Sequence, residues 1–333
     1  MYYKKLLPDI INYVNKNHEK IIGKHGDFKV SFLAQGEYNI NYTIESDFKQ
    51  VLRINTGSQL NLDNQIEYEF NALKVLESTG VTPIPYYLDS TMSDIPHGLL
   101  TMEYLEGEPL SYEHDLPTAA SIFSTIHSLD TTNLNNFIVE ENSIEARLRE
   151  CKHWLDNSLY SDSLTDRQKD FFKKIYDIAC SQVDSGKYLL DNPRHVINNT
   201  EVNSSNFIIG ESAYLIDWEK PVIADPSQDI TQFLAPTTTL WKTDTILSQS
   251  QIDEFYEVYT SQNPKLKDIE KRVNIYKPYL LLRALTWCAY AYVEYQKPDK
   301  KIVNQDTLER LIMYLDVDFM RDLYNKLGGA WKI

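Results

Sequence analysis

Three polar residues in the middle of the chain have the side-chain types that phosphate chemistry requires. Glu201, Asn206 and Asp217 flank two short apolar segments, residues 207–209 and 214–216. These segments predict buried strands joined by a tight, glycine-containing turn, with the polar residues at the strand ends. Two carboxylates and an amide oxygen can orient a hydroxyl group and hold magnesium against a polyphosphate. A hairpin whose polar ends are simply solvated fits the same spacing, so the pattern alone leaves both interpretations open.

The composition is that of an ordinary globular protein. With 333 residues, of which 42% are hydrophobic and 24% charged, the chain is long enough for two domains with their own cores. Its net charge of -15 argues against binding to nucleic acid or to an anionic membrane, because both need a basic surface. The same charge is compatible with a cationic substrate.

Cysteine usage and hydropathy exclude several further classes. The three cysteines, Cys151, Cys180 and Cys288, lie far apart and suggest neither a disulfide framework nor a zinc site. The N-terminal residues lack the apolar stretch of a secretory signal. The most apolar run, residues 279–293, contains Arg283 and is shorter than the roughly 20 residues of a membrane helix. We therefore expect a cytoplasmic protein.

The N-terminal third begins with a helical pattern and then changes period. Leu6, Ile10 and Val14 recur at helical spacing, which predicts a leading helix over residues 3–20. Alternating apolar residues then predict an antiparallel meander of three strands. These strands span residues 29–33, 40–44 and 50–54. A helix over residues 65–78 and strands over residues 86–89 and 98–105 complete this part.

Two features of this part have a chemical as well as a structural interpretation. Gly36, between the first two strands, fits a phosphate-binding loop or an ordinary hairpin turn. Arg53 lies on the third strand between Leu52 and Ile54. An inward-facing arginine there needs an anionic partner, because an unpaired buried charge is costly. Glu69, beside the apolar stripe of the helix, is either that partner or a solvated charge.

From residue 106 onwards the pattern becomes mainly helical. The Glu-Gly-Glu-Pro sequence at residues 106–109 breaks the preceding strand, which predicts a hinge and two domains, residues 1–105 and 106–333. His127 lies beside the apolar face of the first helix, where a hydrogen-bonded core histidine is favoured over a catalyst. Thr165-x-x-Gln168 is a capping-box pattern. The expected helices span residues 117–129, 143–155, 165–183, 250–259, 279–293 and 306–327.

The order of these parts resembles the aminoglycoside phosphotransferase and choline kinase family over residues 28–295. The N-terminal motifs are Gln35-Gly36-x-x-Asn39, Val51-Leu-Arg-Ile with Glu69, and Leu100-Thr-Met-Glu-Tyr-Leu-x-Gly. The C-terminal motifs are Ile126-His-Ser-Leu, Glu201-x-x-x-x-Asn206, Leu215-Ile-Asp-Trp-Glu219 and Asp225-Pro-x-x-Asp229. The resemblance implies an α+β, two-lobed protein-kinase-like fold. A small N-terminal lobe with an antiparallel sheet would precede a larger, mostly helical C-terminal lobe.

The resemblance also implies a kinase that transfers the γ-phosphate of ATP or GTP to a hydroxyl group. Arg53 would replace the usual nucleotide-clamping lysine, and residues 102–104 would form the hinge beside the base. The residues implied on the nucleotide side are Gly36, Asn39, Arg53, Glu69, Met102, Glu103 and Tyr104. Asn206 and Asp217 would bind Mg²⁺, Glu201 would be the catalytic acidic residue, and Asp229 would hold the catalytic loop.

Two departures from the family pattern concern catalysis. Asn199 replaces a histidine that braces the loop, and an amide can form hydrogen bonds in its place. Glu201 replaces an aspartate and is one methylene longer, and misplacing a catalytic oxygen by about 1 Å can cost roughly a hundredfold in rate. Because phosphoryl transfer depends mainly on positioning and electrostatics, a backbone shift would let Glu201 act. The alternative is a pseudokinase that serves as a nucleotide-binding or regulatory module.

The expected acceptor is a small hydroxyl compound such as an amino alcohol, an aminoglycoside or a sugar. In the related fold it would lie against the helices that follow Asp229. Aromatic residues are frequent there, namely Trp241, Tyr256, Tyr259, Trp287, Tyr290 and Tyr292. Combined with the acidic residues Glu219, Asp253 and Glu257, they would suit a quaternary ammonium group or an amino sugar. Aromatic residues at helical spacing also fit a core, and that interpretation is favoured.

Overall fold

The chain divides into two compact units. The computed structural model describes residues 2–23, 26–36, 38–58, 60, 62–297, 305–327 and 331. Unit 1 comprises Met1–Ser111, Thr132–Ile138 and Ser205–Val222, and unit 2 comprises Tyr112–Thr131, Val139–Ser204 and Ile223–Ile333. The sequence predicts one change of domain near residue 106. In the structure the chain passes between the units several times, because two later segments belong to unit 1.

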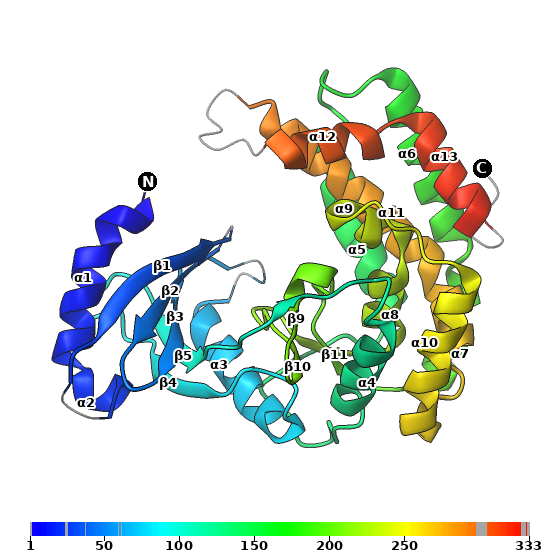
Figure 1. Cartoon of the computed structure of the whole chain (residues 1–333). Helices are drawn as coiled ribbons and strands as arrows, with labels where there is room; N and C mark the ends of the chain where they lie inside the picture. Colours follow the sequence, from blue (N-terminus) through cyan, green and yellow to red (C-terminus); the bar gives the residue numbers. More distant parts are fainter. Residues whose placement is uncertain are drawn as a thin grey trace. The chain divides into compact units, whose positions relative to one another are not determined.

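Unit 1 is built on a five-stranded antiparallel sheet with the strand order β1-β2-β3-β5-β4 (Figure 1). The strands are β1 (Lys29–Gln35), β2 (Asn39–Glu45), β3 (Lys49–Asn55), β4 (Pro85–Asp89) and β5 (Leu99–Glu103). The helices are α1 (Tyr2–Lys16), α2 (His18–Ile21) and α3 (Gln65–Leu76), and α3 continues into the 3-10 turn η1 (Glu77–Thr79). The predicted meander and the two later strands are confirmed.

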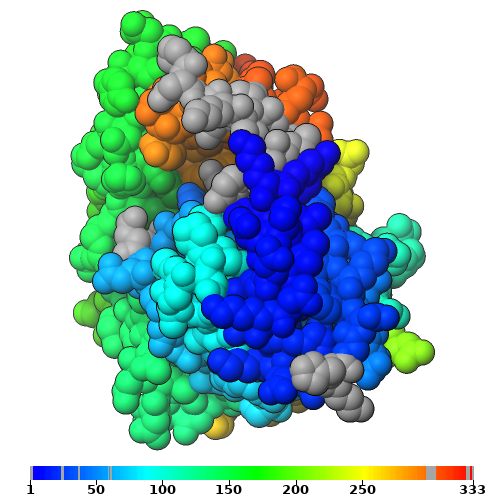
Figure 2. Space-filling model, turned by 90° about the vertical axis from the view of Figure 1, so that its left-hand side faces the viewer, coloured from blue at the N-terminus to red at the C-terminus, as the bar shows by residue number. Residues whose placement is uncertain are grey.

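The two faces of this sheet carry different residues, as the two-residue period of a strand requires. One face packs against α1, whose other side forms the outer surface seen in dark blue in Figure 2. The apolar cluster between them includes Leu6, Ile10, Val14, Ile40, Tyr42, Leu52 and Ile54. The other face carries Asn39 and Asn41 of β2, which pair in register with Asn55 and Arg53 of β3. The strand pattern therefore places four polar side chains together.

A second, smaller sheet of unit 1 has the order β10-β9-β6. Its strands are β6 (Glu108–Pro109), β9 (Phe207–Ile209) and β10 (Ala213–Leu215). Gly107 has φ of +154°, and a Cβ there would lie 2.5 Å from the carbonyl oxygen of Ile209. A Cβ on Gly210 would lie 2.5 Å from the carbonyl oxygen of Glu106. Both positions therefore need glycine, and the expected hinge at residues 106–109 contains a short strand fixed to β9.

Unit 2 is mainly helical. Its helices are α4 (Leu116–Ile126), α5 (Ser143–Asp156), α6 (Asp166–Ser181), α7 (Lys187–Asp191), α8 (Ser227–Leu234), α9 (Pro236–Lys242), α10 (Gln249–Gln262), α11 (Ile269–Tyr295), α12 (Gln305–Tyr314) and α13 (Val317–Leu327). The 3-10 turns are η2 (Val183–Gly186), η3 (Ser204–Asn206) and η4 (Pro264–Leu266), of which η3 crosses into unit 1. A small sheet has the order β7-β11-β8, formed by β7 (Ile138–Val139), β8 (Val196–Asn198) and β11 (Val222–Ala224). The capping box that Thr165 and Gln168 predict is present at the start of α6.

Two predicted helices have different bounds in the structure. Residues 306–327 form two helices rather than one, because the Oδ1 of Asp316 accepts a hydrogen bond from the backbone N–H of Phe319 (2.8 Å) and caps α13. Helix α11 begins ten residues earlier than residue 279 and continues past Pro278. Buried residues on both sides of the proline, including Tyr276 and Leu280, pack into the unit 2 core and offset the loss of one backbone hydrogen bond.

His127 is a buried core residue, as the sequence favours. Its Nδ1 lies 2.8 Å from the hydroxyl oxygen of Tyr259, which belongs to the same unit. Burial lowers the pKa of His127 to about 3, because the charged imidazolium would lose its water.

This burial predicts an acid-sensitive contribution to stability. Between about pH 3 and pH 6.5 the unfolded chain binds a proton at His127 and the folded chain does not, so the free energy of unfolding falls as the pH falls below 6.5. In His127→Gln the slope of that free energy against pH should decrease by up to about 1.4 kcal/mol per pH unit. Urea unfolding from pH 7 to pH 5 measures the slope. The control is His114→Gln, whose side chain is 72% exposed; an equal effect there would contradict the assignment.

Within the described residues, every helix is too short or too polar to cross a lipid bilayer.

Candidate functional site

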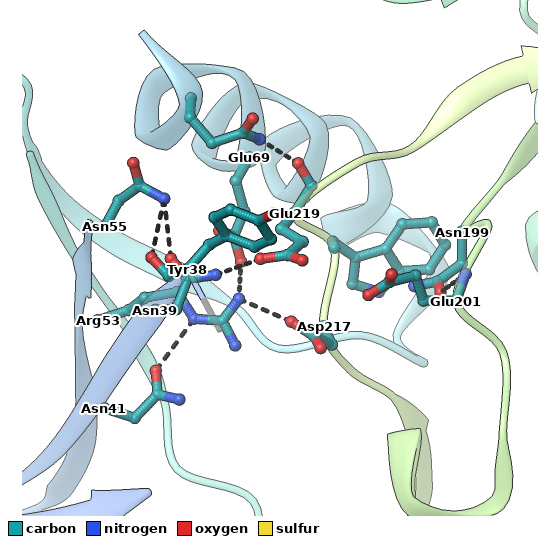
Figure 3. Close-up of polar contacts among 12 residues, drawn as sticks. Tyr38, Asn39, Asn41, Arg53, Asn55, Glu69, Asn199, Glu201, Asp217 and Glu219 are labelled. Atoms are coloured by element: carbon teal, nitrogen blue, oxygen red, sulfur yellow. Dashed lines mark hydrogen bonds and ion pairs between the residues drawn. The ribbon is translucent and has the colours of Figure 1, made fainter. Parts of the chain in front are cut away.

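Arg53 is the centre of a buried polar network in unit 1 (Figure 3). Its Nη1 lies 2.5 Å from Oε1 of Glu69 on α3 and 3.0 Å from Oδ1 of Asp217, which follows β10. Its Nε donates to Oδ1 of Asn41 (3.0 Å). Of the two open interpretations of Glu69, the structure therefore supports the ion-pair partner. The network joins strand β3, helix α3 and the segment at Asp217, which lies 164 residues after Arg53 in the chain.

The electrostatics of this network are those of a buried cation surrounded by carboxylates. Burial alone would lower the pKa of Arg53, but the charges of Glu69, Asp217 and Glu219 outweigh it and raise that pKa. Burial raises the pKa of Glu69 to about 7, against the opposing attraction of Arg53. Arg53 therefore stays charged. Asp217 lies at the edge of the network, where its side chain is 31% exposed.

Glu219 belongs to this network, a role that the sequence does not predict. Its carboxylate accepts a hydrogen bond from Nδ2 of Asn39, and its backbone oxygen accepts one from Nε2 of Gln65 (Figure 3). Asn39 is also bound by Asn55, whose Nδ2 donates to its Oδ1 (3.0 Å). The i, i+2 spacing of Asn39 and Asn41 could have indicated a polar sheet face. No comparable pattern marks Glu219.

Gly36 lies in the turn between β1 and β2. Its backbone N–H donates to the carbonyl oxygen of Asn39 (2.9 Å), which closes a hairpin turn. A Cβ at this position would meet nothing closer than 3.9 Å, so the turn itself does not require glycine. The sequence motif also includes Glu37, which lies outside the described residues.

The three expected hinge residues lie at the end of β5. Met102 is buried and pairs with Val51 of β3 in the sheet register. The backbone N–H of Glu103 donates to the carbonyl oxygen of Ile84 (2.8 Å), so this donor is already used. The ring of Tyr104 lies under the ammonium group of Lys49, 3.7 Å from its centroid.

Asn206 and Asp217 lie at the same end of the β9–β10 hairpin. The register pairs Phe207 with Leu215, so the residues beyond each strand leave the hairpin side by side. The backbone N–H of Ile216 donates to the carbonyl oxygen of Asn206 (2.8 Å), which extends the pairing by one step. Asp217 has φ of 64°, a conformation that Asp and Asn tolerate better than most residues. Together these side chains offer amide and carboxylate oxygens, the donors that Mg²⁺ prefers.

A cluster formed only by ionisable or sulfur ligands is not found among the described residues. No group of three or more histidine, cysteine, aspartate or glutamate side chains there could hold a metal ion. A site with one carboxylate and one amide is instead typical of Mg²⁺ that takes its other ligands from phosphates and water.

Glu201 lies on a tightly braced loop of unit 2. Its backbone N–H donates to Oδ1 of Asn199 (3.1 Å), so this asparagine forms the loop contact expected of it (Figure 3). Asn203 donates from Nδ2 to the backbone oxygen of Glu201 (3.2 Å). Thr200, between Asn199 and Glu201, has φ of 71°. This value is unusual for a β-branched residue and occurs mainly where surrounding contacts hold the backbone.

Asp229 supplies those contacts from α8. Its Oδ2 accepts from the backbone N–H of Asn199 (2.6 Å), and its Oδ1 accepts from that of Thr200 (2.9 Å). Burial raises the pKa of Asp229 to about 7, and the two backbone hydrogen bonds oppose the rise. These contacts are those of a residue that holds the loop, as expected from the sequence.

A pocket of about 150 Å³ lies within unit 2, next to this loop. Asn203, two residues after Glu201, forms part of its wall. The other polar wall residues are on α8, α9 and α11, and they include Gln232, Thr238 and Arg283. Trp241 of α9 and Trp287 of α11 contribute aromatic surface.

The aromatic residues singled out in the sequence have different environments. Trp241 and Trp287 are partly buried against the unit 2 core and also line the pocket. Tyr259 is fully buried and stacks on Phe255, as the core interpretation requires. The expected acidic residues do not line this pocket, because Glu219 belongs to unit 1 and Asp253 and Glu257 lie on α10.

Comparison with known proteins identifies relatives of this arrangement. The sequence of residues 29–264 matches the family model of the phosphotransferase enzyme family. No curated protein matches the chain in sequence. Among solved structures, a protein assigned as an aminoglycoside phosphotransferase from Ralstonia eutropha JMP134 has a TM-score of 0.71 at 13% identity, covering 98% of this chain and 99% of that one.

Two further solved structures are similar over most of their length. Choline kinase from Cryptosporidium parvum has a TM-score of 0.63 at 14% identity and covers 97% of this chain and 99% of its own. Spectinomycin phosphotransferase, in complex with ADP and spectinomycin, has a TM-score of 0.57 at 15% identity, with coverage of 91% and 92%. At these identities the likeness concerns the fold, and the predicted α+β, two-lobed kinase-like fold is confirmed.

Proposed function

Because this chain belongs to the phosphotransferase enzyme family, we propose that it transfers the γ-phosphate of ATP or GTP to a hydroxyl group of a small molecule. The observation that carries the proposal is the buried ion-pair network in which Arg53 joins Glu69 to Asp217. An arginine held between two carboxylates is fixed in position, and fixed charges stabilise a transferring phosphoryl group better than mobile ones.

Unit 1 would bind the nucleotide. Arg53 would hold the phosphates, as the clamping lysine does in related folds. Gly36 and Asn39 would lie over them in the β1–β2 turn, and Glu69 would keep Arg53 in place. The backbone at residues 102–104 would contact the base, although the N–H of Glu103 is engaged by Ile84. The complex of spectinomycin phosphotransferase with ADP supports nucleotide use in this fold.

Asn206 and Asp217 would hold Mg²⁺. Their oxygens fit a hard cation, and the hydrogen bond between Ile216 and Asn206 keeps the two residues at one end of the hairpin. When bound, the cation neutralises charge on the transferring phosphate. Asp217 also accepts from Arg53, so the same carboxylate would keep the arginine aligned with the phosphates.

Glu201 would accept the proton of the substrate hydroxyl. Its backbone is held by Asn199, and through Asn199 and Thr200 by Asp229, so the loop is fixed before the substrate binds. This bracing supports a catalytic role for the longer glutamate side chain, because positioning rather than basicity limits such a residue.

A phosphate-transfer assay tests the proposal. The protein would be incubated with Mg²⁺, radiolabelled ATP or GTP, and a panel of amino alcohols, sugars, hydroxy acids and aminoglycosides. We expect label to move to at least one compound. A parallel thermal-shift measurement with nucleotide and Mg²⁺ should raise the melting temperature. Stabilisation without any transfer would contradict the kinase assignment, and no stabilisation would contradict the nucleotide site.

Replacement of Glu201 tests the catalytic assignment separately. Glu201→Gln keeps the size of the side chain but removes its ability to accept a proton, so kcat should fall on the order of 100-fold. Nucleotide affinity should change little, because the loss concerns the transition state. Glu201→Asp should retain more activity than Glu201→Gln. If Glu201→Gln turned over as fast as the unmodified protein, another group would have to be the acceptor.

A further inference from the structure

The pocket next to the Glu201 loop has a chemical character that narrows the class of acceptor. All of its lining residues belong to unit 2, and apart from Asn203 they are on α8, α9, α11 and α12. Asn203 connects it to the loop, since the same side chain lines the pocket and donates to the backbone oxygen of Glu201. A compound held here would therefore have its hydroxyl group close to the loop that carries Glu201.

One wall of the pocket is a rigid aromatic surface. The rings of Trp241 and Trp287 meet edge to face, with centroids 5.5 Å apart and planes at 72°. Trp241 also stacks on Tyr314 at 5.5 Å and 23°. The hydroxyl of Tyr314 donates to the carbonyl oxygen of Thr237 (3.2 Å), which holds that ring in place. Such a surface suits the apolar face of a ring or a short carbon chain.

Arg283 is the charged residue among the wall residues that the structure describes; none of the others is acidic or basic. Its side chain is 19% exposed, and its Nε lies 3.0 Å from Oε2 of Glu150. Its Cζ lies 5.7 Å from the ring centroid of Trp154. The first contact uses Nε, and the second uses the face of the guanidinium group. Among the described residues no hydrogen bond from Nη1 or Nη2 is found, so these terminal nitrogens are the donors that a ligand in the pocket would engage.

This lining is unfavourable for an amine. Aromatic sites that bind quaternary ammonium groups use the attraction between a cation and ring faces, and a nearby arginine opposes it. The ion pair with Glu150 reduces this repulsion but leaves no carboxylate among the wall residues that the structure describes. A guanidinium group that donates from its two terminal nitrogens instead matches a carboxylate or a similar oxyanion. The net charge of -15 does not reverse this preference, because exposed charges beyond about 8 Å are largely screened at physiological salt.

We propose that this pocket binds the acceptor, and that the acceptor is a hydroxyl compound with an oxyanion at Arg283 and an apolar face against Trp241 and Trp287. The inference rests on the proposed kinase function only in so far as it calls the bound compound the acceptor. The choice of an oxyanion over an amine depends on the pocket itself, so it is tested by binding without nucleotide.

Tryptophan fluorescence provides that test. Two sets of probes each share a carbon skeleton and carry a carboxylate, no charge or an ammonium group: glucuronate, glucose and glucosamine, and glycerate, glycerol and serinol. Choline is added as a quaternary ammonium compound. We expect the carboxylate of at least one set to change the fluorescence and to bind at least tenfold more tightly than its neutral and amine counterparts. In Trp287→Phe the change in fluorescence should be markedly smaller, which would locate the probe in this pocket.

Substitution of Arg283 separates recognition from folding. Arg283→Met should weaken binding of the carboxylate at least tenfold and leave binding of the neutral analogue within threefold. The matched control is Arg149→Gln on α5, whose side chain is 69% exposed and bonded to Glu145; it should bind as the unmodified protein does. Thermal unfolding of both variants shows whether they are folded, and Arg283→Lys, which keeps the charge but loses the paired donors, provides a second variant that should also bind more weakly.

Three outcomes would overturn the inference: tightest binding by an amine or by choline, equal binding by a carboxylate and its neutral analogue, or no binding by any probe. The outcome for the kinase function is independent. A protein that binds carboxylates through Arg283 but transfers no phosphate would retain the inference about the pocket and lose the proposed reaction. A protein that phosphorylates an amino alcohol would retain the proposed reaction and lose the inference about the pocket.

Discussion

Asp217→Asn is expected to lower kcat by on the order of a thousandfold while the protein stays folded. The carboxylate would supply both a ligand to Mg²⁺ and an acceptor for Arg53, and loss of metal-assisted charge stabilisation costs several kcal/mol in the transition state. Each 1.4 kcal/mol corresponds to about a tenfold change in rate. Asparagine is the substitution least harmful to the backbone here, because it tolerates the positive φ of 64° at this position.

The measurement has two parts and one control. Turnover would be followed as a function of Mg²⁺ concentration, and the apparent affinity for Mg²⁺ should weaken together with the rate. The control is Glu211→Gln, which removes an exposed carboxylate from the turn at the other end of the same hairpin and should leave kcat unchanged. A variant Asp217→Asn that kept more than a tenth of the original turnover would show that the metal is held elsewhere.

The second large effect concerns stability. Arg53→Met should reduce the stability of unit 1 by about 3–5 kcal/mol, because Glu69 would keep its burial and lose its cation. Glu69→Met should have an effect of the same sign, although smaller, since Arg53 would still contact Asp217. The double variant Arg53→Met/Glu69→Met should lose less than the sum of the two single variants, because neither charge is then left buried and unpaired.

Amide hydrogen exchange in β3 and α3 would report these changes within unit 1. The comparison of four proteins forms a double-mutant cycle, and the coupling energy is the quantity of interest. Losses that add exactly would mean that Arg53 and Glu69 stabilise unit 1 independently, in contradiction to the 2.5 Å contact between them.

Much of the fold was predictable because its elements obey simple periods. The β2 and β3 strands alternate between an apolar and a polar face, and the capping box at Thr165 marks the start of α6. The split between α12 and α13 was missed although Asp316 is a good capping residue, because the apolar period continues across it and a cap was not expected within one stripe. The apolar run that predicts this helix begins only at residue 279, whereas α11 begins at Ile269 in a more polar segment and continues through Pro278.

The candidate site was predictable only where a motif marks the residue. Arg53 and Glu69 stand out because a charge between two apolar strand residues requires a partner. Asn41 is marked only by its i, i+2 spacing from Asn39, and the role of Glu219 is not predictable because its contact with Asn39 joins segments 180 residues apart. The chemical character of the pocket could not be predicted from the sequence either. It depends on Arg283 rather than on the acidic residues of α10, and only the folded helices bring Arg283 beside Trp241 and Trp287.

The return of residues 205–222 to unit 1 has a consequence for synthesis on the ribosome. Arg53 and Glu69 emerge early, but Asp217 follows 164 residues after Arg53. At roughly 5–20 residues per second, the network around Arg53 therefore stays incomplete for on the order of 10–30 s. During that interval the nascent sheet lacks the β9–β10 hairpin as well as the carboxylate groups of Asp217 and Glu219. Recombinant fragments that end near residue 105 would be left permanently in this incomplete state, so we expect expression of unit 1 to need the hairpin, supplied either in the same chain or as a separate peptide.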